Sequence, residues 1–472
     1  MTRETKLVLI AAAAVVILGV AAALLTLHPA TPHDSTVIFK AVEPVDVMRV
    51  VISNEYGSTD ISFTGEGYVV DDIPAERVDM DELIDLLTNC GKVSALQEVN
   101  ASPKDLAIYG LEKPAAQVAV TYKDGSSLTI MLGNIERVSG NFYMRVDGTT
   151  AVYLAEAKRF SAFLLPKKSL VEDQITPELA LSSPLSALLN VTFSGAQLKQ
   201  PVTIEAVAAG DPDVVRAALS FGAATHIVRG KGTYELDQTY AVKMLGSLLG
   251  ITATDIVGYA MTDEEIMAFG FDHPTMQVEF DLRNGRDVPV ETFALSVLAK
   301  GNAYYMTCND NGVIYEVAEP AFVHLEYDKL LVRWFLSPLL MDVSEVQVIT
   351  SGQRYDFVLT GETNAEKQVT CNGKPLDIER FRTLYRLLGS AAHDGSPLQD
   401  RTVKGEPLLQ LTYRYRDAGK QPDVMALYKG DTRRLWVQVN GVSEIAMREA
   451  YLPRVQQALA DLWTDKPIET DW

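Results

Sequence analysis

The feature that most constrains the fold of this chain is an internal repeat with fixed spacing. Tyr109 to Pro114 (YGLEKP) matches Phe269 to Pro274 (FGFDHP) without a gap, at a constant offset of 160 residues. In each copy an aromatic residue precedes a glycine, Gly110 or Gly270, and a proline follows four residues later. Glycine can close a helix in the left-handed conformation, and proline prevents the helix from resuming. The repeat therefore predicts a helix end followed by a strand in both copies.

Further parts recur in the same order along the chain. An apolar residue followed by aspartate begins an amphipathic helix three times, at Val78-Asp79, Leu236-Asp237 and Leu376-Asp377. A potential capping box precedes each aromatic-glycine pair, formed by Ser102 with Asp105 and by Thr262 with Glu265. Each copy is thus predicted to bury one face of a helix.

Hairpin signals follow the proline in every copy. Turn sequences lie between apolar, β-prone segments, as is typical of antiparallel hairpins. They are Asp124-Gly125, Asn284-Gly285 and Asp417 to Gly419 for a first hairpin, and Asp147-Gly148, Asn311-Gly312 and Asn440-Gly441 for a second. The pattern predicts an antiparallel meander combined with a helix.

From these signals we predict an α+β fold made of three repeated antiparallel-sheet-plus-helix units behind an N-terminal transmembrane helix. The predicted units cover 38–178, 182–338 and 342–468, and the third is divergent because it keeps only Gly405-Glu406-Pro407 of the motif. Residues 1–37 are predicted to form a cytoplasmic tip, the membrane anchor and a linker.

The predicted anchor runs from Leu7 to Leu27 and contains no charged residue. As a helix it is about 31 Å long, which matches the hydrocarbon core of a bilayer. Arg3 and Lys6 precede it, so the N-terminus is expected in the cytoplasm and the bulk of the chain outside it, in a single-pass arrangement. The alternative is a cleaved signal peptide, although Ala21 to Ala23 lie inside the apolar run instead of after it.

Composition excludes several classes of protein. Among 472 residues, 62 acidic side chains against 42 basic ones give a formal charge of -20. Such a charge repels nucleic acid, so no nucleic-acid partner is expected. Three widely spaced cysteines, Cys90, Cys308 and Cys371, predict neither a disulfide framework nor a metal site.

The first copy also resembles a known family. Asp105 to Pro114 (DLAIYGLEKP), the turn Leu132-Gly133-Asn134 and Gly140 to Tyr143 resemble the bacterial domain-of-unknown-function family 4340. The resemblance is close over about 40–170 and recognisable over 185–335. It implies single-pass proteins with extracytoplasmic repeats, many of which accompany ABC-type export systems related to gliding-motility transporters. It implies no catalytic residue.

The sequence contains no nucleotide-binding loop, nucleophile elbow or zinc-protease motif. The six histidines, at 28, 33, 226, 273, 324 and 393, are scattered, and acidic groups such as Asp71-Asp72 and Asp263 to Glu265 are explained by a loop and a helix start. Tyr143, Tyr304, Tyr305 and Trp436 could form a stacking surface for sugars or peptide, but core packing explains them as well. We therefore assign no catalytic, cofactor-binding or metal-binding residue and expect no cofactor.

The motif residues of the repeat, Tyr109, Gly110, Pro114, Phe269, Gly270 and Pro274, are expected to be structural. Repetition of a scaffold predicts a non-enzymatic interaction protein that binds another envelope component. The family resemblance suggests an ABC transporter subunit as that partner. A module that binds envelope polymer or a small solute is the alternative, and an envelope hydrolase is a further one.

Overall fold

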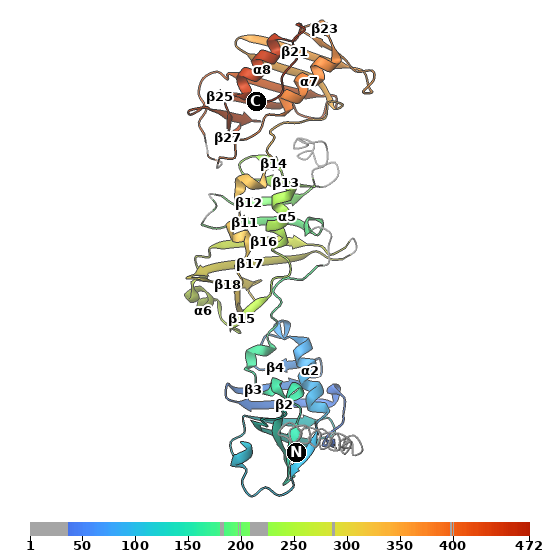
Figure 1. Ribbon diagram of the computed structural model, residues 1–472, viewed down its shortest axis with the longest axis vertical. Helices are drawn as coiled ribbons and strands as arrows, with labels where there is room; N and C mark the ends of the chain where they lie inside the picture. The colour runs from blue at the N-terminus through green and yellow to red at the C-terminus, as the bar shows by residue number, and fades with distance from the viewer. Residues whose placement is uncertain are drawn as a thin grey trace, which may run out of the picture. The chain divides into compact units, whose positions relative to one another are not determined.

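The computed structural model describes residues 36–179, 184–196, 198, 200–207, 225–285, 288–396, 399 and 401–472. The chain forms two compact units, unit 1 over 1–172 and unit 2 over 173–472 (Figure 1). The three predicted repeat boundaries stay a prediction. The described residues form four antiparallel sheets, one with two strands and three with eight or nine.

Unit 1 contains one large sheet and a two-stranded one. The strand order of the large sheet is β4-β3-β2-β7-β8-β9-β10-β6, and β1 pairs with β5. The strands are β1 (Val37–Ile38), β2 (Val47–Asn54), β3 (Gly57–Phe63), β4 (Tyr68–Val70), β5 (Ser94–Ala95), β6 (Gln97–Asn100), β7 (Ala116–Tyr122), β8 (Ser127–Ile135), β9 (Phe142–Val146) and β10 (Val152–Ala155). The helical segments are η1 (Pro44–Asp46), η2 (Ala75–Arg77), α2 (Met80–Gly91), η3 (Ala107–Tyr109), α3 (Ala157–Phe160), η4 (Ser161–Leu164) and η5 (Lys167–Leu170).

Unit 2 contains two large sheets. The first has the order β14-β13-β12-β11-β16-β17-β18-β19-β15. Its strands are β11 (Leu188–Ser194), β12 (Val202–Ala206), β13 (His226–Arg229), β14 (Thr233–Glu235), β15 (Ala253–Gly258), β16 (Met276–Leu282), β17 (Glu291–Lys300), β18 (Ala303–Cys308) and β19 (Ile314–Val317). The accompanying helical segments are η6 (Pro184–Ser186), α5 (Gln238–Gly246), α6 (Asp263–Ile266), the π-helical η7 (Met267–Phe271), η8 (Ala321–His324) and η9 (Tyr327–Leu330).

The second large sheet of unit 2 has the order β23-β22-β21-β20-β24-β25-β26-β27. Its strands are β20 (Val343–Thr350), β21 (Gln353–Thr360), β22 (Gln368–Cys371), β23 (Lys374–Leu376), β24 (Leu409–Tyr415), β25 (Asp423–Lys429), β26 (Arg434–Val439) and β27 (Val442–Arg448). Two helices, α7 (Ile378–Gly389) and α8 (Tyr451–Ala460), contact each other. All three large sheets therefore share one order for the seven strands around β2, β11 and β20.

The amphipathic helices begin at the predicted aspartates. Asp79 accepts hydrogen bonds from the backbone of Asp81 and Glu82, both at 3.0 Å. Asp237 and Asp377 cap α5 and α7 in the same way, through Tyr240 and Arg380. Such a cap contributes about 1 kcal/mol to a helix, so the same local solution recurs at each of these starts.

Each of these helices buries one apolar face. In α2 the buried side chains are Leu83, Leu86, Leu87 and Cys90, and the helix lies against β2 (Figure 1). In α7 they are Phe381, Leu384, Leu387 and Leu388. Burial of a leucine or phenylalanine side chain stabilises the fold by roughly 1.5–3 kcal/mol, so this face holds helix and sheet together.

The predicted fold class is wrong, because the described chain is mostly β-sheet with short helical segments. Several predicted helices are shorter than expected. Ser102 caps no helix; its N–H donates to Asn100 Oδ1 at 3.0 Å, and only Ala107–Tyr109 is helical, as a 3-10 turn. In unit 2 the segment after β19 likewise contains only the two 3-10 turns η8 and η9. Segments this short cannot close enough i to i+4 hydrogen bonds to offset helix nucleation.

The single-pass prediction also receives a correction. In the part of the chain that the structure describes, no helix is long and apolar enough to cross a membrane. The predicted anchor, Leu7 to Leu27, lies outside the described residues.

Candidate functional site

The predicted motif in unit 1 forms a tight corner between η3 and β7. Gly110 ends η3 with φ 71° and ψ 15°, the predicted left-handed conformation. The Tyr109 ring packs edge to face against Tyr143 of β9, with 5.0 Å between the centroids and 75° between the planes. Pro114 lies two residues before β7 begins. We call this arrangement the aromatic–glycine corner.

Unit 2 has the same corner on a different backbone. Thr262 and Glu265 form the predicted capping box, α6 continues into the π-helical turn η7, and Gly270 adopts φ 130° and ψ 4°. Phe269 packs on Tyr305 of β18, at 5.0 Å and 77°, and Pro274 precedes β16 by two residues. The ring pair is thus preserved although the turn has changed.

The two corners divide the same space differently. Register places Leu132 opposite Ala116, and Val297 opposite Met276, so Gly133 and Leu298 are equivalent. A Cβ on Gly133 would lie 2.1 Å from the Tyr109 carbonyl oxygen, whereas the Leu298 side chain fills the space beside Gly270. In unit 1 strand β8 has no side chain at this position, so the backbone of the turn packs directly on it. In unit 2 the Leu298 side chain of β17 occupies the equivalent space.

Beside the corner, unit 1 exposes three apolar side chains that we call the apolar tip: Ile108, Ile135 and Val138. Their exposed fractions are 65%, 56% and 94%. Ile108 lies in η3, which packs on Gly133 and Asn134, directly before Ile135. Val138 lies in the β8–β9 connection, where Gly140 donates to the Glu136 carbonyl at 2.8 Å.

The equivalent positions in unit 2 are not apolar in this way. Ala268 replaces Ile108, and Lys300 replaces Ile135. The Lys300 ammonium lies 4.3 Å from the Phe269 ring centroid and donates to the Phe269 carbonyl at 3.2 Å. The unit 2 corner does expose Met267 of η7, at 57%, but it has no apolar side chains equivalent in size and exposure to Ile108 and Ile135, so the three-residue apolar tip is found in unit 1.

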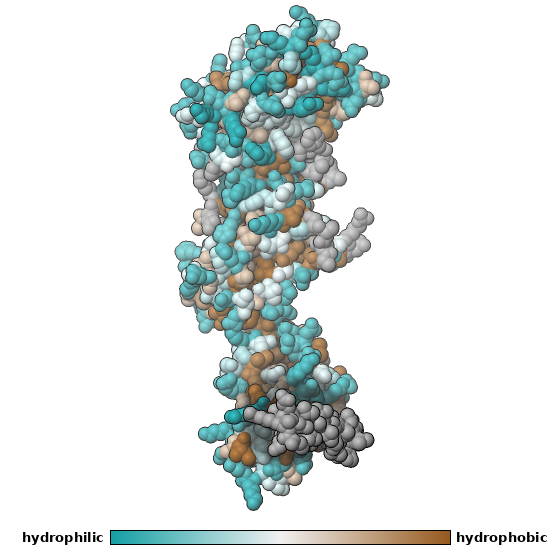
Figure 2. All heavy atoms as spheres, in the orientation of Figure 1, coloured by the Kyte–Doolittle hydropathy of each residue, from teal (hydrophilic) through white to brown (hydrophobic). Residues whose placement is uncertain are grey.

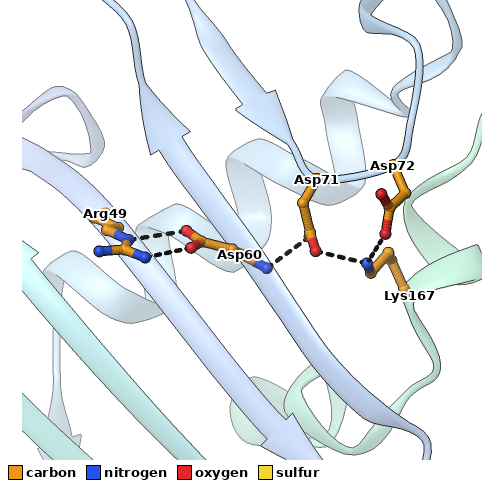
Figure 3. Close-up of polar contacts among 5 residues, drawn as sticks. All are labelled: Arg49, Asp60, Asp71, Asp72 and Lys167. Atoms are coloured by element: carbon orange, nitrogen blue, oxygen red, sulfur yellow. Dashed lines mark hydrogen bonds and ion pairs between the residues drawn. The ribbon is translucent and has the colours of Figure 1, made fainter.

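A separate feature of unit 1 is the row of linked charged side chains shown in Figure 3. Arg49 binds Asp60 through two guanidinium nitrogens, and the Asp60 N–H donates to Asp71 Oδ1 at 2.7 Å. Lys167 binds Asp71 at 2.7 Å and Asp72 at 2.9 Å. The hydrogen bond from Arg49 lowers the pKa of Asp60. Each of these charged groups has a partner. The row of side chains therefore links β2, β3, the end of β4 and η5 through hydrogen bonds and ion pairs.

Asp71 occupies a position where unit 2 uses asparagine. Asn372 after β22 accepts from the Asp356 N–H at 2.8 Å, donates its own N–H to the Asp356 carbonyl at 2.9 Å, and donates Nδ2 to the Arg354 carbonyl at 2.9 Å. Asn309 makes the same three bonds to β17. A carboxylate cannot donate the third bond, so Asp71 accepts one from Lys167 instead.

Unit 2 contains a pocket of about 260 Å³ lined by Arg333, Trp334, Ala392, His393, Asp394, Arg448 and Trp472. We call it the tryptophan–arginine pocket. Asp394 is bound by Arg434 at 2.7 Å and accepts from the Ser396 N–H and hydroxyl at 2.9 and 2.5 Å. Burial and the Arg333 charge lower the pKa of His393.

These groups do not form a catalytic triad. The Ser396 hydroxyl bonds directly to Asp394, and His393 Nδ1 accepts from the Gly395 N–H at 3.1 Å. A triad needs the histidine between the two. Among the described residues, no cluster of histidine, cysteine and acidic side chains has the geometry of a metal site.

The other histidines and aromatic residues of the sequence analysis are dispersed. His226 is buried, and its Nε2 lies 3.0 Å from the Leu188 carbonyl; burial lowers its pKa. Tyr304 binds Glu319 at 2.5 Å, and the Arg401 guanidinium lies 3.7 Å from the Trp436 ring. Sequence reasoning missed Trp334 and Trp472, because no periodic pattern marks either residue.

The fold and these sites define a protein of repeated antiparallel β-sheets, with a structural corner and a small pocket. Residues 71–186 match the family model described as "Domain of unknown function (DUF4340)". This match confirms the family resemblance of the first copy. No curated protein matches the chain.

Proposed function

We propose that this protein is a non-enzymatic interaction scaffold that docks a partner protein on the apolar tip of unit 1. The observation that carries the proposal is the contrast between the two corners. Unit 2 has Ala268 and a paired Lys300 where unit 1 exposes Ile108 and Ile135. Since the corner folds with either set, the apolar set is not needed for the turn.

Exposure over the rest of the described chain points the same way. Thirteen of the 23 large hydrophobic side chains exposed among the described residues belong to unit 1, although it is the shorter unit. In Figure 2 brown hydrophobic atoms reach the surface of unit 1 at several places. These thirteen are spread over unit 1, and a local group such as the apolar tip is the arrangement typical of a protein–protein interface.

The partner that we propose is a subunit of an ABC-type export complex, which the family resemblance suggests. We also propose that the protein works outside the cytoplasm. Protease protection in intact cells tests this location independently of the partner.

The test of docking is a variant that gives unit 1 two residues of unit 2 and also removes the third apolar side chain. Ile108→Ala with Ile135→Lys, together with Val138→Ser, removes the apolar tip, and crosslinked complexes are then captured from native cells and identified. We expect the unmodified protein to capture a transporter subunit and the variant to lose it. The control is Val45→Lys, because Val45 is also exposed, at 64%, on η1. Equal capture by the variant, or loss with the control as well, would contradict the proposal.

A further inference from the structure

The tryptophan–arginine pocket has walls from separate segments that the backbone holds in place. Trp334 and Ala392 form an antiparallel bridge, and the His393 N–H donates to the Arg333 carbonyl at 2.9 Å. The Phe335 N–H donates to the Ala391 carbonyl at 3.0 Å. The side of the pocket formed by residues 333–335 and 391–393 is therefore a paired backbone and not a free loop.

The remaining wall comes from the end of β27 and from Trp472. Arg448 lies opposite Arg434 in the β26–β27 register. The Trp472 indole donates Nε1 to the Ser390 hydroxyl at 2.8 Å, and its ring packs edge to face on the buried Tyr451 at 5.1 Å. Both contacts fix the orientation of the ring, so the pocket is formed before any ligand enters.

The charge of the pocket is opposite to that of the chain. Arg333 and Arg448 have no acidic partner within ion-pair distance among the residues that the structure describes, whereas Asp394 is already bound by Arg434. The formal charge of the whole chain is -20. Two arginines without acidic partners in one concave site are the groups that recognise carboxylate or phosphate.

The two tryptophans supply a second kind of recognition. Trp334 has 51% of its surface exposed, and Trp472 is half-buried. An exposed indole face beside a cation suits the flat face of a ring, whether of a sugar or of an aromatic acid. A volume of about 260 Å³ lies just below the usual range of ligand sites and suits one ring and its substituent.

We propose that this pocket binds a single ring that carries a carboxylate group. The tryptophans contact the ring, and Arg333 and Arg448 bind the anionic group. The ring belongs either to an acidic sugar or to an aromatic acid. This site lies in unit 2, so it goes beyond the docking surface proposed for unit 1, and either proposal can fail alone.

The test uses the full chain and four small probes. D-glucuronate and indole-3-acetate carry the anionic group, and D-glucose and indole-3-ethanol are their neutral counterparts. Binding is measured by calorimetry, and quenching of tryptophan fluorescence serves as a second readout for the two sugars. We expect at least one acid to bind at least tenfold more tightly than its neutral counterpart. The acid that binds identifies the source of the ring.

Two variants with matched controls locate the binding. Trp334→Ala should weaken the bound acid at least tenfold, and Trp463→Ala is the control because Trp463 is equally exposed, at 52%. Arg333→Ala combined with Arg448→Ala should abolish the preference for the acid over its neutral counterpart. Arg386→Ala on α7 is the charge control, since Arg386 is exposed and does not line the pocket.

Three results would overturn the proposal: no probe binds up to its solubility limit, acid and neutral probes bind equally, or the control variants lose as much affinity as the pocket variants. Circular dichroism of every variant shows whether it is folded. Loss of partner capture by the unit 1 variant has no bearing on any of these results.

Discussion

The aromatic–glycine corners of unit 1 and unit 2 share a sequence motif and a ring pair but differ in almost everything around them. Tyr109 on Tyr143 and Phe269 on Tyr305 have the same 5.0 Å separation. Yet one turn is a 3-10 helix that ends at Gly110, and the other is a capped α-helix that runs into a π-helical turn at Gly270. The aromatic pair is thus the constant element, and the backbone around each glycine adapts to the neighbouring strand.

The largest expected effect comes from giving unit 1 the strand residue of unit 2. Gly133→Leu places a side chain where even a Cβ would lie 2.1 Å from the Tyr109 carbonyl oxygen, so it should destabilise unit 1 by about 3 kcal/mol or more. The reverse change, Leu298→Gly, leaves only a gap beside Gly270 and should cost roughly 1–2 kcal/mol.

Urea denaturation can separate the two units. All four tryptophans, at 334, 436, 463 and 472, belong to unit 2, so their fluorescence reports that unit alone. Limited proteolysis within residues 36–172 reports unit 1. A Gly133→Leu protein that resists proteolysis as well as the unmodified protein would show that the corner can move away from β8.

The second prediction separates steric fit from backbone conformation at the glycine of the corner. Gly110→Ala should destabilise unit 1 by about 2 kcal/mol, because φ is 71° and the new Cβ would lie 2.7 Å from the Asn134 backbone nitrogen. Gly125→Ala is the matched control, with φ 81° and open space around it. It should cost about 1 kcal/mol. Proteolysis in urea measures both losses of stability. If Gly110→Ala and Gly125→Ala destabilise unit 1 equally, the contact with Asn134 contributes nothing and only the backbone conformation matters.

The third prediction concerns the position that is Asp71 in unit 1 and Asn372 in unit 2. Asn372→Ala removes two side-chain hydrogen bonds to β21 and should destabilise unit 2 by about 1–2 kcal/mol. Lys167→Ala removes the ion pairs to Asp71 and Asp72. The Lys167 side chain is only 12% exposed, but the two carboxylate side chains are 40% and 73% exposed, so water screens both pairs and the cost should be at most about 1 kcal/mol. Urea midpoints check both values. A Lys167→Ala effect larger than that of Asn372→Ala would reverse this ranking.

The smallest effect is a pH dependence confined to unit 2. Burial lowers the pKa of His226 and His393 below the ordinary value of 6.5, so the unfolded chain binds more protons in that range. The stability that these two neutral histidines contribute is complete above about pH 6.5, the ordinary histidine pKa. It is lost as the pH falls through the lower pKa values of the two histidines in the folded protein. Tryptophan fluorescence in urea at pH 7 and at pH 5 should show this loss, and His226→Gln with His393→Gln should reduce it. If the double variant loses as much stability between pH 7 and pH 5 as the unmodified protein does, the assignment to these two histidines is contradicted.

The features that the sequence predicts well are local ones. Asp79, Asp237 and Asp377 begin their helices, and the turns at Gly125, Gly148 and Gly312 adopt positive φ, because a cap or a turn depends on few neighbouring residues.

The features that it predicts poorly depend on contacts between distant segments. The helix expected after Ser102 is replaced by a bend, since Asn100 takes the Ser102 N–H and donates to the Tyr109 hydroxyl at 3.1 Å. The tryptophan–arginine pocket joins residues more than 130 positions apart, between 333 and 472, and no spacing rule marks it. The contrast that defines the apolar tip can be recognised only after the strand registers show that Ile135 and Lys300 are equivalent positions.

The docking of a partner on the apolar tip is tested most directly by site-specific photo-crosslinking in intact cells. A photoreactive amino acid is placed at position 138 in one protein and at position 45 in another, because both positions are exposed but only the first belongs to the apolar tip. We predict that position 138 gives a discrete adduct with a transporter subunit and that position 45 does not. The same adducts from both positions, or none from position 138, would contradict the account.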